Sequence, residues 1–135
     1  MGSWFSIKKA KLILIVEDEE PIATVLAKYL ELQGFKTAWA RDGVQGVELA
    51  EKLIPDLILL DIIMPKMDGF TALQMIKSKP KTQDIPILAC TSLNMIEDVE
   101  RFCKNGAAGY ITKPFDLKRV LEKINATLEL PHKES

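Results

Sequence analysis

Histidine and cysteine, on which many catalytic and metal sites depend, are nearly absent from this chain of 135 residues. The one histidine, His132, stands in the C-terminal stretch 131–135. This placement excludes Ser/His/Asp hydrolysis, a zinc site with histidine ligands and a phosphohistidine carrier. The two cysteines, Cys90 and Cys103, show no CxxC or zinc-ligand spacing. We therefore expect two reduced, partly buried thiols in a cytosolic protein.

The chain also lacks an excess of charge of one sign and any long hydrophobic run. Its 18 basic and 19 acidic residues give a net charge of −1, which disfavours direct binding to nucleic acid or to an anionic membrane. The longest apolar stretches, such as 12–16 and 57–60, are far shorter than the ~18 residues of a membrane span. Acidic residues 17–20 follow the first stretch at once, unlike the cleavage region of a signal peptide. We expect a cytoplasmic protein without membrane insertion.

What is present is the composition of one globular domain, 47% hydrophobic and 27% charged. A chain of this length buries enough surface to fold without disulfides or metal ions. We expect a single domain over residues 11–130, preceded by a leader over 1–10 and followed by a tail over 131–135.

Short apolar blocks alternate with segments of helical periodicity. The blocks predict five strands over residues 12–16, 37–40, 57–60, 87–90 and 110–112. The periodic segments predict helices from Pro21 to a stop at Gly34, and over residues 43–53, 70–77 and 94–105, with a last helix capped by Asp116. The first two helices carry apolar faces formed by Ile22, Val25, Leu26 and Tyr29, and by Val44, Val47 and Leu49. This alternation predicts an α/β fold with a five-stranded parallel sheet, doubly wound, with helices on both faces.

Ligands of such sheets bind beyond the carboxyl ends of the strands, and polar residues follow four of the predicted strands. They are Glu17 and Asp18, Asp61, Thr91 and Ser92, and Lys113 and Pro114. Glu19 and Glu20 stand beside Pro21, where acidic residues commonly serve only as helix caps. Asp61 ends the most hydrophobic strand, where its carboxylate is partly desolvated and helix capping does not explain its presence.

Carboxylates that converge repel one another and need a cation, and oxygen ligands with few protein partners favour Mg²⁺ over Ca²⁺. Lys113 adds a charge suited to a phosphate oxygen, and Thr91 adds one hydroxyl. Together these groups suit phosphoryl transfer onto Asp61 as the nucleophile. The chain has no GxxxxGK[ST] loop and no GxGxxG, so the phosphate donor must be another molecule.

The chain resembles the response regulator receiver domain of two-component signalling, in its stand-alone form similar to chemotaxis regulators. The resemblance covers residues 11–130 and lies in four pieces in order: Glu17-Asp18, the segment 61–69 (DIIMPKMDG), Thr91, and Lys113-Pro114-Phe115. It implies the strand order 2-1-3-4-5. It also implies a phosphorylation-controlled binding module, not an enzyme in the usual sense.

The resemblance implies that Asp61 accepts phosphate from a sensor histidine kinase or a phosphotransfer protein. Asp18 and Asp61 would bind Mg²⁺ directly, Glu17 mainly through water, and the backbone carbonyl of Ile63 would complete the protein ligands. Thr91 and Lys113 would contact the phosphoryl oxygens, and the Lys113-Pro114 peptide would be cis.

The resemblance also implies a switch in which Thr91 moves toward the phosphate and Tyr110 turns inward. The switch would reshape the face formed by the helix over 94–105, the strand over 110–112 and the last helix, to control a downstream protein or a phosphorylation-dependent homodimer. Tyr110 as a static tyrosine at the edge of the core is the alternative. Met95, Val99 and Phe102 are candidate contacts, unless their apolar stripe belongs to the core.

Three departures from the family pattern bear on the chemistry. Glu17 replaces the commoner aspartate. Ser92 stands where alanine is usual, and its greater size and polarity leave phosphate access open to test. Ile63 and Leu93, two residues beyond Asp61 and Thr91, cannot orient an attacking water, which predicts slow self-dephosphorylation.

Three other functions are considered. An aspartate-nucleophile phosphatase is disfavoured because such enzymes carry the nucleophile after the first strand in a DxD arrangement. Residues 17–19 of this chain read Glu-Asp-Glu instead. A flavodoxin-like electron carrier is disfavoured because residues 17–20 would repel a flavin phosphate. The remaining alternative is a degenerate receiver that serves as a scaffold and takes no phosphate.

Overall fold

Strands and helices alternate along the chain in the computed structural model, which describes residues 9–64, 66–92 and 96–129. In chain order the elements are β1 (Leu12–Val16), α2 (Glu20–Leu32), β2 (Lys36–Ala40), α3 (Gly43–Leu53), β3 (Leu57–Asp61), α4 (Gly69–Lys77), β4 (Ile87–Ser92), α5 (Ile96–Lys104), β5 (Gly109–Lys113) and α6 (Leu117–Glu129). Within these residues, no helix is long and apolar enough to cross a membrane. The predicted leader and tail, with His132, lie outside the described residues except for residues 9 and 10.

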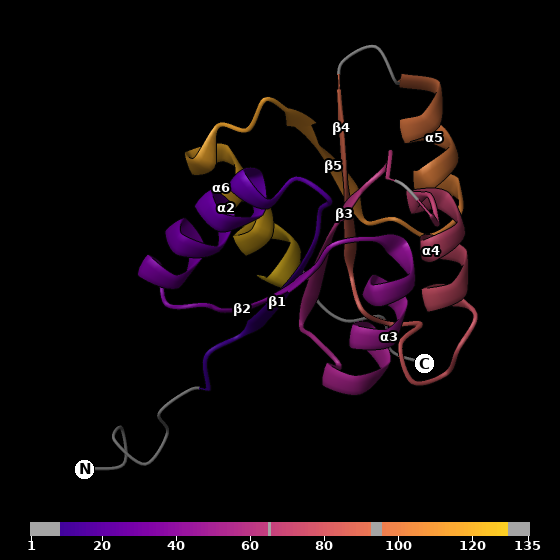
Figure 1. Cartoon of the computed structure of the whole chain (residues 1–135), viewed down its shortest axis with the longest axis horizontal. Helices are drawn as coiled ribbons and strands as arrows, with labels where there is room; N and C mark the ends of the chain where they lie inside the picture. Colours follow the sequence, from indigo (N-terminus) through magenta and orange to yellow (C-terminus); the bar gives the residue numbers. More distant parts are fainter. Residues whose placement is uncertain (1–8, 65, 93–95, 130–135) are drawn as a thin grey trace.

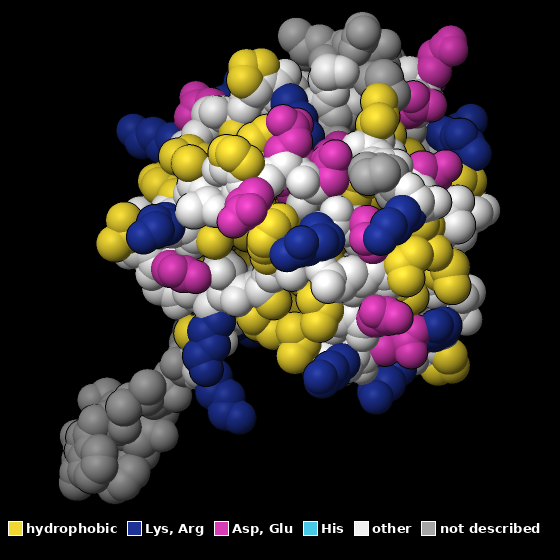
Figure 2. Space-filling view, in the orientation of Figure 1, with side chains coloured by type: hydrophobic (Ala, Val, Ile, Leu, Met, Phe, Trp, Pro, Cys, Tyr) yellow, Lys and Arg dark blue, Asp and Glu magenta, His cyan; other side chains and the backbone are white. Residues whose placement is uncertain are grey.

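The five strands form one parallel sheet in the order β2-β1-β3-β4-β5. Helices α2 and α6 cover one face of the sheet, and α3, α4 and α5 cover the other (Figure 1). This arrangement confirms the predicted doubly wound α/β fold and its strand order. Acidic and basic side chains are interspersed on the face seen in Figure 2, as the small net charge predicts.

The sheet is buried on both faces because its central strands are apolar throughout. In β1, Leu14 and Val16 face the core under α3, α4 and α5, whereas Ile13 and Ile15 face the core under α2 and α6. All of residues 57–60 in β3 are buried as well. Continuous hydrophobic runs of this kind are typical of parallel strands between two helical layers.

Local signals set the helix ends much as the sequence predicts. Asp42 caps α3 by accepting a hydrogen bond from the Gln45 backbone N–H, and Ile54 ends the helix in the left-handed region, directly before Pro55. Gly34, at φ +99°, turns the chain after α2, and Asp116 accepts hydrogen bonds from the backbone N–H groups at the start of α6. The ends of these helices therefore follow from capping chemistry.

Several predicted details are wrong. Val25 and Val44, assigned to buried helical faces, are 54% and 41% exposed. These two assignments are wrong because smaller residues, such as Ala23 in α2 and Gly46 in α3, make the contact with the sheet. The cysteines are both free, but Cys90 is fully buried in β4 and Cys103 is exposed on α5, so neither is partly buried.

Phe102, for which the sequence leaves both a partner contact and a core position open, is a core residue. It is 1% exposed and meets the Phe70 ring edge to face, with the ring centroids 5.6 Å apart. The alternative that this stripe belongs to the core is therefore correct for Phe102. Val99 is half-buried, and Met95 lies outside the described residues.

Candidate functional site

The candidate site residues meet at the carboxyl edge of the sheet, around a cavity of about 270 Å³. Asp61, Thr91, Ser92 and Lys113 are the last residues of their strands, whereas the sequence placed them just after the strands. Their backbones are therefore fixed by the hydrogen-bonded sheet. The cavity is lined by Asp18, Glu19, Asp61, Ile62, Ile63, Cys90, Thr91, Ser92 and Lys113.

Lys113 joins two carboxylates that come from different strands. Its Nζ lies 3.0 Å from Glu17 Oε1 and 3.1 Å from Asp61 Oδ2. Both carboxylates are buried, with exposed fractions of 2% and 5%. Burial lowers the pKa of Lys113, but hydrogen bonds and charges from Glu17 and Asp61 outweigh it and raise the pKa above its ordinary value. Lys113 is therefore a fixed positive charge at the bottom of the site.

Asp61 has an unusual acidity for an aspartate. Burial, with the nearby charge of Glu17, raises the pKa of Asp61 to about 6, against the opposing charge and hydrogen bond of Lys113. The Ile63 backbone N–H donates to Asp61 Oδ1 at 3.3 Å. At neutral pH most of this carboxyl is therefore ionised, although it is poorly solvated.

Glu17, Asp18 and Glu19 form an acidic cluster beside this pair, with one carboxylate oxygen of each within 4.8 Å of the others. Glu19 stands at the N-cap position of α2, but its side chain makes no capping hydrogen bond. The interpretation of Glu19 as only a cap is therefore wrong, because its carboxylate joins the cluster. Glu20 lies in the first turn of α2, as expected. Close carboxylates of this kind suit a hard divalent cation.

The edge strand β2 holds the start of this acidic loop. The Glu17 backbone N–H donates to the Ala40 carbonyl at 2.9 Å, and the Trp39 indole N–H donates to the Glu17 carbonyl at 2.6 Å. Sequence reasoning missed Trp39, because a tryptophan in a strand normally signals packing alone.

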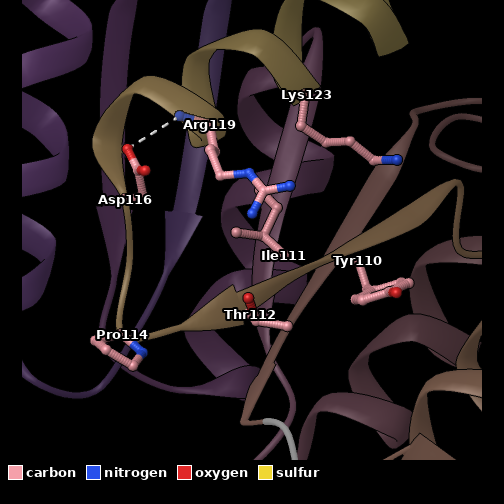
Figure 3. Close-up of a pocket in the computed structure, with 7 residues that line it drawn as sticks. All are labelled: Tyr110, Ile111, Thr112, Pro114, Asp116, Arg119 and Lys123. Carbon is pink, nitrogen blue, oxygen red and sulfur yellow. Dashed lines mark hydrogen bonds between the residues drawn. The ribbon is translucent and has the colours of Figure 1, made fainter.

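The two residues of the implied switch differ in exposure. Thr91 is buried, and its hydroxyl donates to the Ser92 carbonyl at 3.1 Å. Tyr110 is 48% exposed, so it is not a residue of the core. Tyr110 borders a second cavity, of about 520 Å³, together with Arg119 and Lys123 of α6 (Figure 3). The Lys113-Pro114 peptide between the two cavities is cis, as the resemblance implies.

Fold and site together define a doubly wound α/β protein with an acidic pocket, closed by a lysine, at the carboxyl ends of its strands. Residues 13–125 match the family model of the response regulator receiver domain. The chain therefore belongs to the response regulator receiver family, which confirms the resemblance seen in the sequence. Receiver domains are regulatory modules of two-component systems, and phosphorylation and Mg²⁺ binding are general to the family.

Individual relatives agree with this assignment. The chain is 41% identical over 116 residues to the transcriptional regulator RpaA of Synechocystis sp., covering 86% of this chain and 48% of RpaA. It is 34% identical over 118 residues to the polar-differentiation response regulator DivK of Brucella anthropi, covering 87% of this chain and 96% of DivK. The chain thus spans about half the length of RpaA and nearly all of DivK.

A solved structure shows the same fold with a metal ion. The receiver domain of the sensor histidine kinase PA1611 of Pseudomonas aeruginosa is 29% identical and superposes with a TM-score of 0.82, covering 90% of this chain and 99% of that domain. That structure is described as having a magnesium ion coordinated in its active site cleft.

Proposed function

We propose that the chain is a phosphorylation-controlled binding module that takes a phosphoryl group onto Asp61 from a sensor histidine kinase or a phosphotransfer protein. The observation that carries the proposal is the contact of Lys113 with Asp61 and Glu17 in a cavity at the sheet edge. We further propose that it acts in the cytoplasm as one domain over residues 11–130, with the leader and tail as predicted.

The reaction follows from the positions of these groups. An oxygen of Asp61 attacks the phosphorus of a phosphohistidine, the P–N bond breaks, and the imidazole leaves and takes up a proton. Lys113 lies 3.1 Å from Asp61 Oδ2, where its charge can stabilise the oxygens of the transferring group. The Thr91 hydroxyl, on the wall of the same cavity, donates to another of these oxygens. The catalysis is mainly positioning and electrostatic stabilisation.

The donor set fits a magnesium ion. Asp18 and Asp61 would hold it directly, Glu17 mainly through water, and the Ile63 carbonyl as a further ligand, while Glu19 brings one more carboxylate to the cluster. When bound, Mg²⁺ neutralises the carboxylates and the phosphoryl oxygens. The magnesium ion in the related PA1611 receiver supports this proposal.

We propose the face of α5, β5 and α6 as the surface that a downstream protein reads. Phosphorylation would draw Thr91 toward the phosphoryl group and let Tyr110 turn inward from its exposed position. Figure 3 shows Tyr110 on β5 and the cationic side chains Arg119 and Lys123 on α6 around one cavity. A phosphorylation-dependent homodimer through this face is a second use of the same surface.

The phosphorylated state would be long-lived. Ile63 borders the cavity and is 63% exposed, and an aliphatic side chain there cannot orient a water molecule for attack on the phosphorus. Leu93, the other residue expected to act in this way, lies outside the described residues.

The test is phosphate uptake from acetyl phosphate, measured by intact mass with and without Mg²⁺ on wild type, Asp61→Asn and Asp68→Asn. Asp68 is a matched control because it caps α4 through Thr71 and does not line the site cavity. We expect one phosphate on wild type and on Asp68→Asn with Mg²⁺, and none on Asp61→Asn. No uptake by wild type would support the degenerate scaffold instead, and Ser92→Ala would then be the first variant to test.

A further inference from the structure

Both backbone hydrogen-bonding groups of Glu17, the first residue of the acidic cluster, are held by β2. The Glu17 N–H donates to the Ala40 carbonyl at 2.9 Å, and the Glu17 carbonyl accepts the Trp39 indole N–H at 2.6 Å. The first of these bonds belongs to the backbone. The second comes from a side chain, so it can be removed without changing the strand.

The position of Trp39 explains why a side chain makes this bond. Ala40, the last residue of β2, is in register with Val16, the last residue of β1. The backbone ladder therefore makes its final contact at the Glu17 N–H, and the indole N–H binds the carbonyl that follows. Next in the chain are the carboxylates of Asp18 and Glu19, which repel one another and favour spreading of the loop.

Trp39 is itself held firmly enough to act as an anchor. Its ring is partly buried against the core cluster under α2 and α6. The guanidinium of Arg41, the residue that follows β2, lies 4.9 Å from the centroid of the Trp39 ring. A donor fixed by packing in this way loses little entropy when it binds the loop.

We propose that Trp39 is a positioning residue for the divalent cation. Its indole N–H fixes the backbone of Glu17 and thereby the spacing of the carboxylates, so it raises the affinity for Mg²⁺. This inference rests on the proposed function, in which the cluster binds Mg²⁺. The indole N–H is directed to the Glu17 carbonyl, so it acts through the acidic loop and not on the phosphoryl group.

Trp39→Phe tests the proposal because it keeps an aromatic ring and removes the N–H donor. We expect the Kd for Mg²⁺, measured by titration calorimetry, to rise about three- to tenfold, the size typical of one hydrogen bond. At saturating Mg²⁺, phosphate uptake from acetyl phosphate should stay within about twofold of wild type, because the loss of positioning lowers only the affinity for Mg²⁺ and excess metal compensates for that. Tyr29→Phe is the matched control, because it removes a hydroxyl from another aromatic residue packed against the same cluster. It should keep the wild-type Kd.

A second measurement does not depend on whether Trp39→Phe folds. In wild type, the indole ¹H–¹⁵N resonance of Trp39, assigned as the one that persists in Trp4→Phe, should shift during Mg²⁺ titration with the calorimetric Kd. An indole resonance that does not move, or a folded Trp39→Phe protein with a Kd within twofold of wild type, would overturn the proposal. If Trp39→Phe does not fold, the indole titration decides alone. Absence of Mg²⁺ binding by wild type would overturn the metal site and this inference together, whereas an unchanged Kd in Trp39→Phe would overturn only the role of Trp39.

Discussion

Strand β5 takes part in two regions that are built in opposite ways. At its carboxyl end, Lys113 lies between the buried carboxylates of Glu17 and Asp61. Three residues earlier in the same strand, Tyr110 is half-exposed beside the cationic side chains Arg119 and Lys123. The first region is fixed by ion pairs and by the sheet, whereas the second presents a half-exposed aromatic side chain at a cavity. This contrast suits a protein in which chemistry at one end of the strand is read at the surface nearby.

The contrast predicts that the largest effect comes from Lys113→Met. Two buried carboxylates would lose their shared cation, so we expect a loss of about 3 kcal/mol in the free energy of unfolding at pH 7, measured in urea. Phosphate uptake should fall at least about a hundredfold. Lys66→Met is the control. Lys66 Nζ lies 3.5 Å from Asp42 Oδ2, and the Lys66 side chain is 71% exposed. That variant should change stability by less than about 1 kcal/mol. Equal effects of the two variants would remove the distinction between a lysine that joins two buried carboxylates and a largely exposed lysine that pairs with one.

Asp61→Asn should stabilise the protein in the presence of a chelator while abolishing phosphate uptake. The pKa of Asp61 is raised to about 6, so the folded state binds this proton more tightly than the unfolded chain. The stability that the protonated carboxyl contributes is complete below about pH 4 and is lost as the pH rises through 6. The variant should therefore be more stable than wild type by on the order of 2 kcal/mol at pH 7, with the difference vanishing near pH 4. A difference that is the same at both pH values would contradict this explanation.

Ile63→Gln tests whether the aliphatic side chain at this position prolongs the phosphate lifetime. An amide at this position can orient a water molecule, so phosphate loss should be several-fold faster than in wild type. Loss is timed by intact mass after removal of acetyl phosphate, with no phosphatase present. Loss from wild type within seconds would refute the slow self-dephosphorylation that we propose.

Tyr110→Ala should have the smallest effect on the isolated protein. Because Tyr110 is half-exposed, we expect a loss of no more than about 1 kcal/mol in stability. Phosphate uptake should stay within about twofold of wild type, while signalling through the downstream protein is lost. A Tyr110→Ala protein that signals normally after phosphorylation would show that the tyrosine is no part of the switch.

The sequence predicts most of the fold because its signals are local. The helical periodicity of residues 43–53, followed by Pro55, predicts α3 with the bounds that the structure has. Apolar blocks mark the strands, but they cannot mark strand ends that carry polar residues, so β3, β4 and β5 were each predicted too short at the site. Val25 is misassigned, and Phe102 stays open between a partner contact and the core, because a helical stripe does not tell which of its residues face the sheet.

The candidate site is only partly predictable for a similar reason. Asp61, Thr91 and Lys113 were found because each stands at the end of an apolar strand, and parallel strands bring their carboxyl ends together. Glu19 was assigned to capping, since only three-dimensional geometry shows that its carboxylate turns toward Glu17 and Asp18. The bond from Trp39 to Glu17 depends on the register of β1 and β2, and a single sequence contains no signal for it.

The most direct test of the coupling between the two regions is amide hydrogen exchange over residues 109–113 and 117–124, compared with and without phosphate on Asp61. We expect phosphorylation to change exchange in both segments, and we expect wild type treated with Mg²⁺ but no acetyl phosphate to change far less around Tyr110. Exchange that is identical in the phosphorylated and unphosphorylated protein would contradict a link between the buried site and the exposed face.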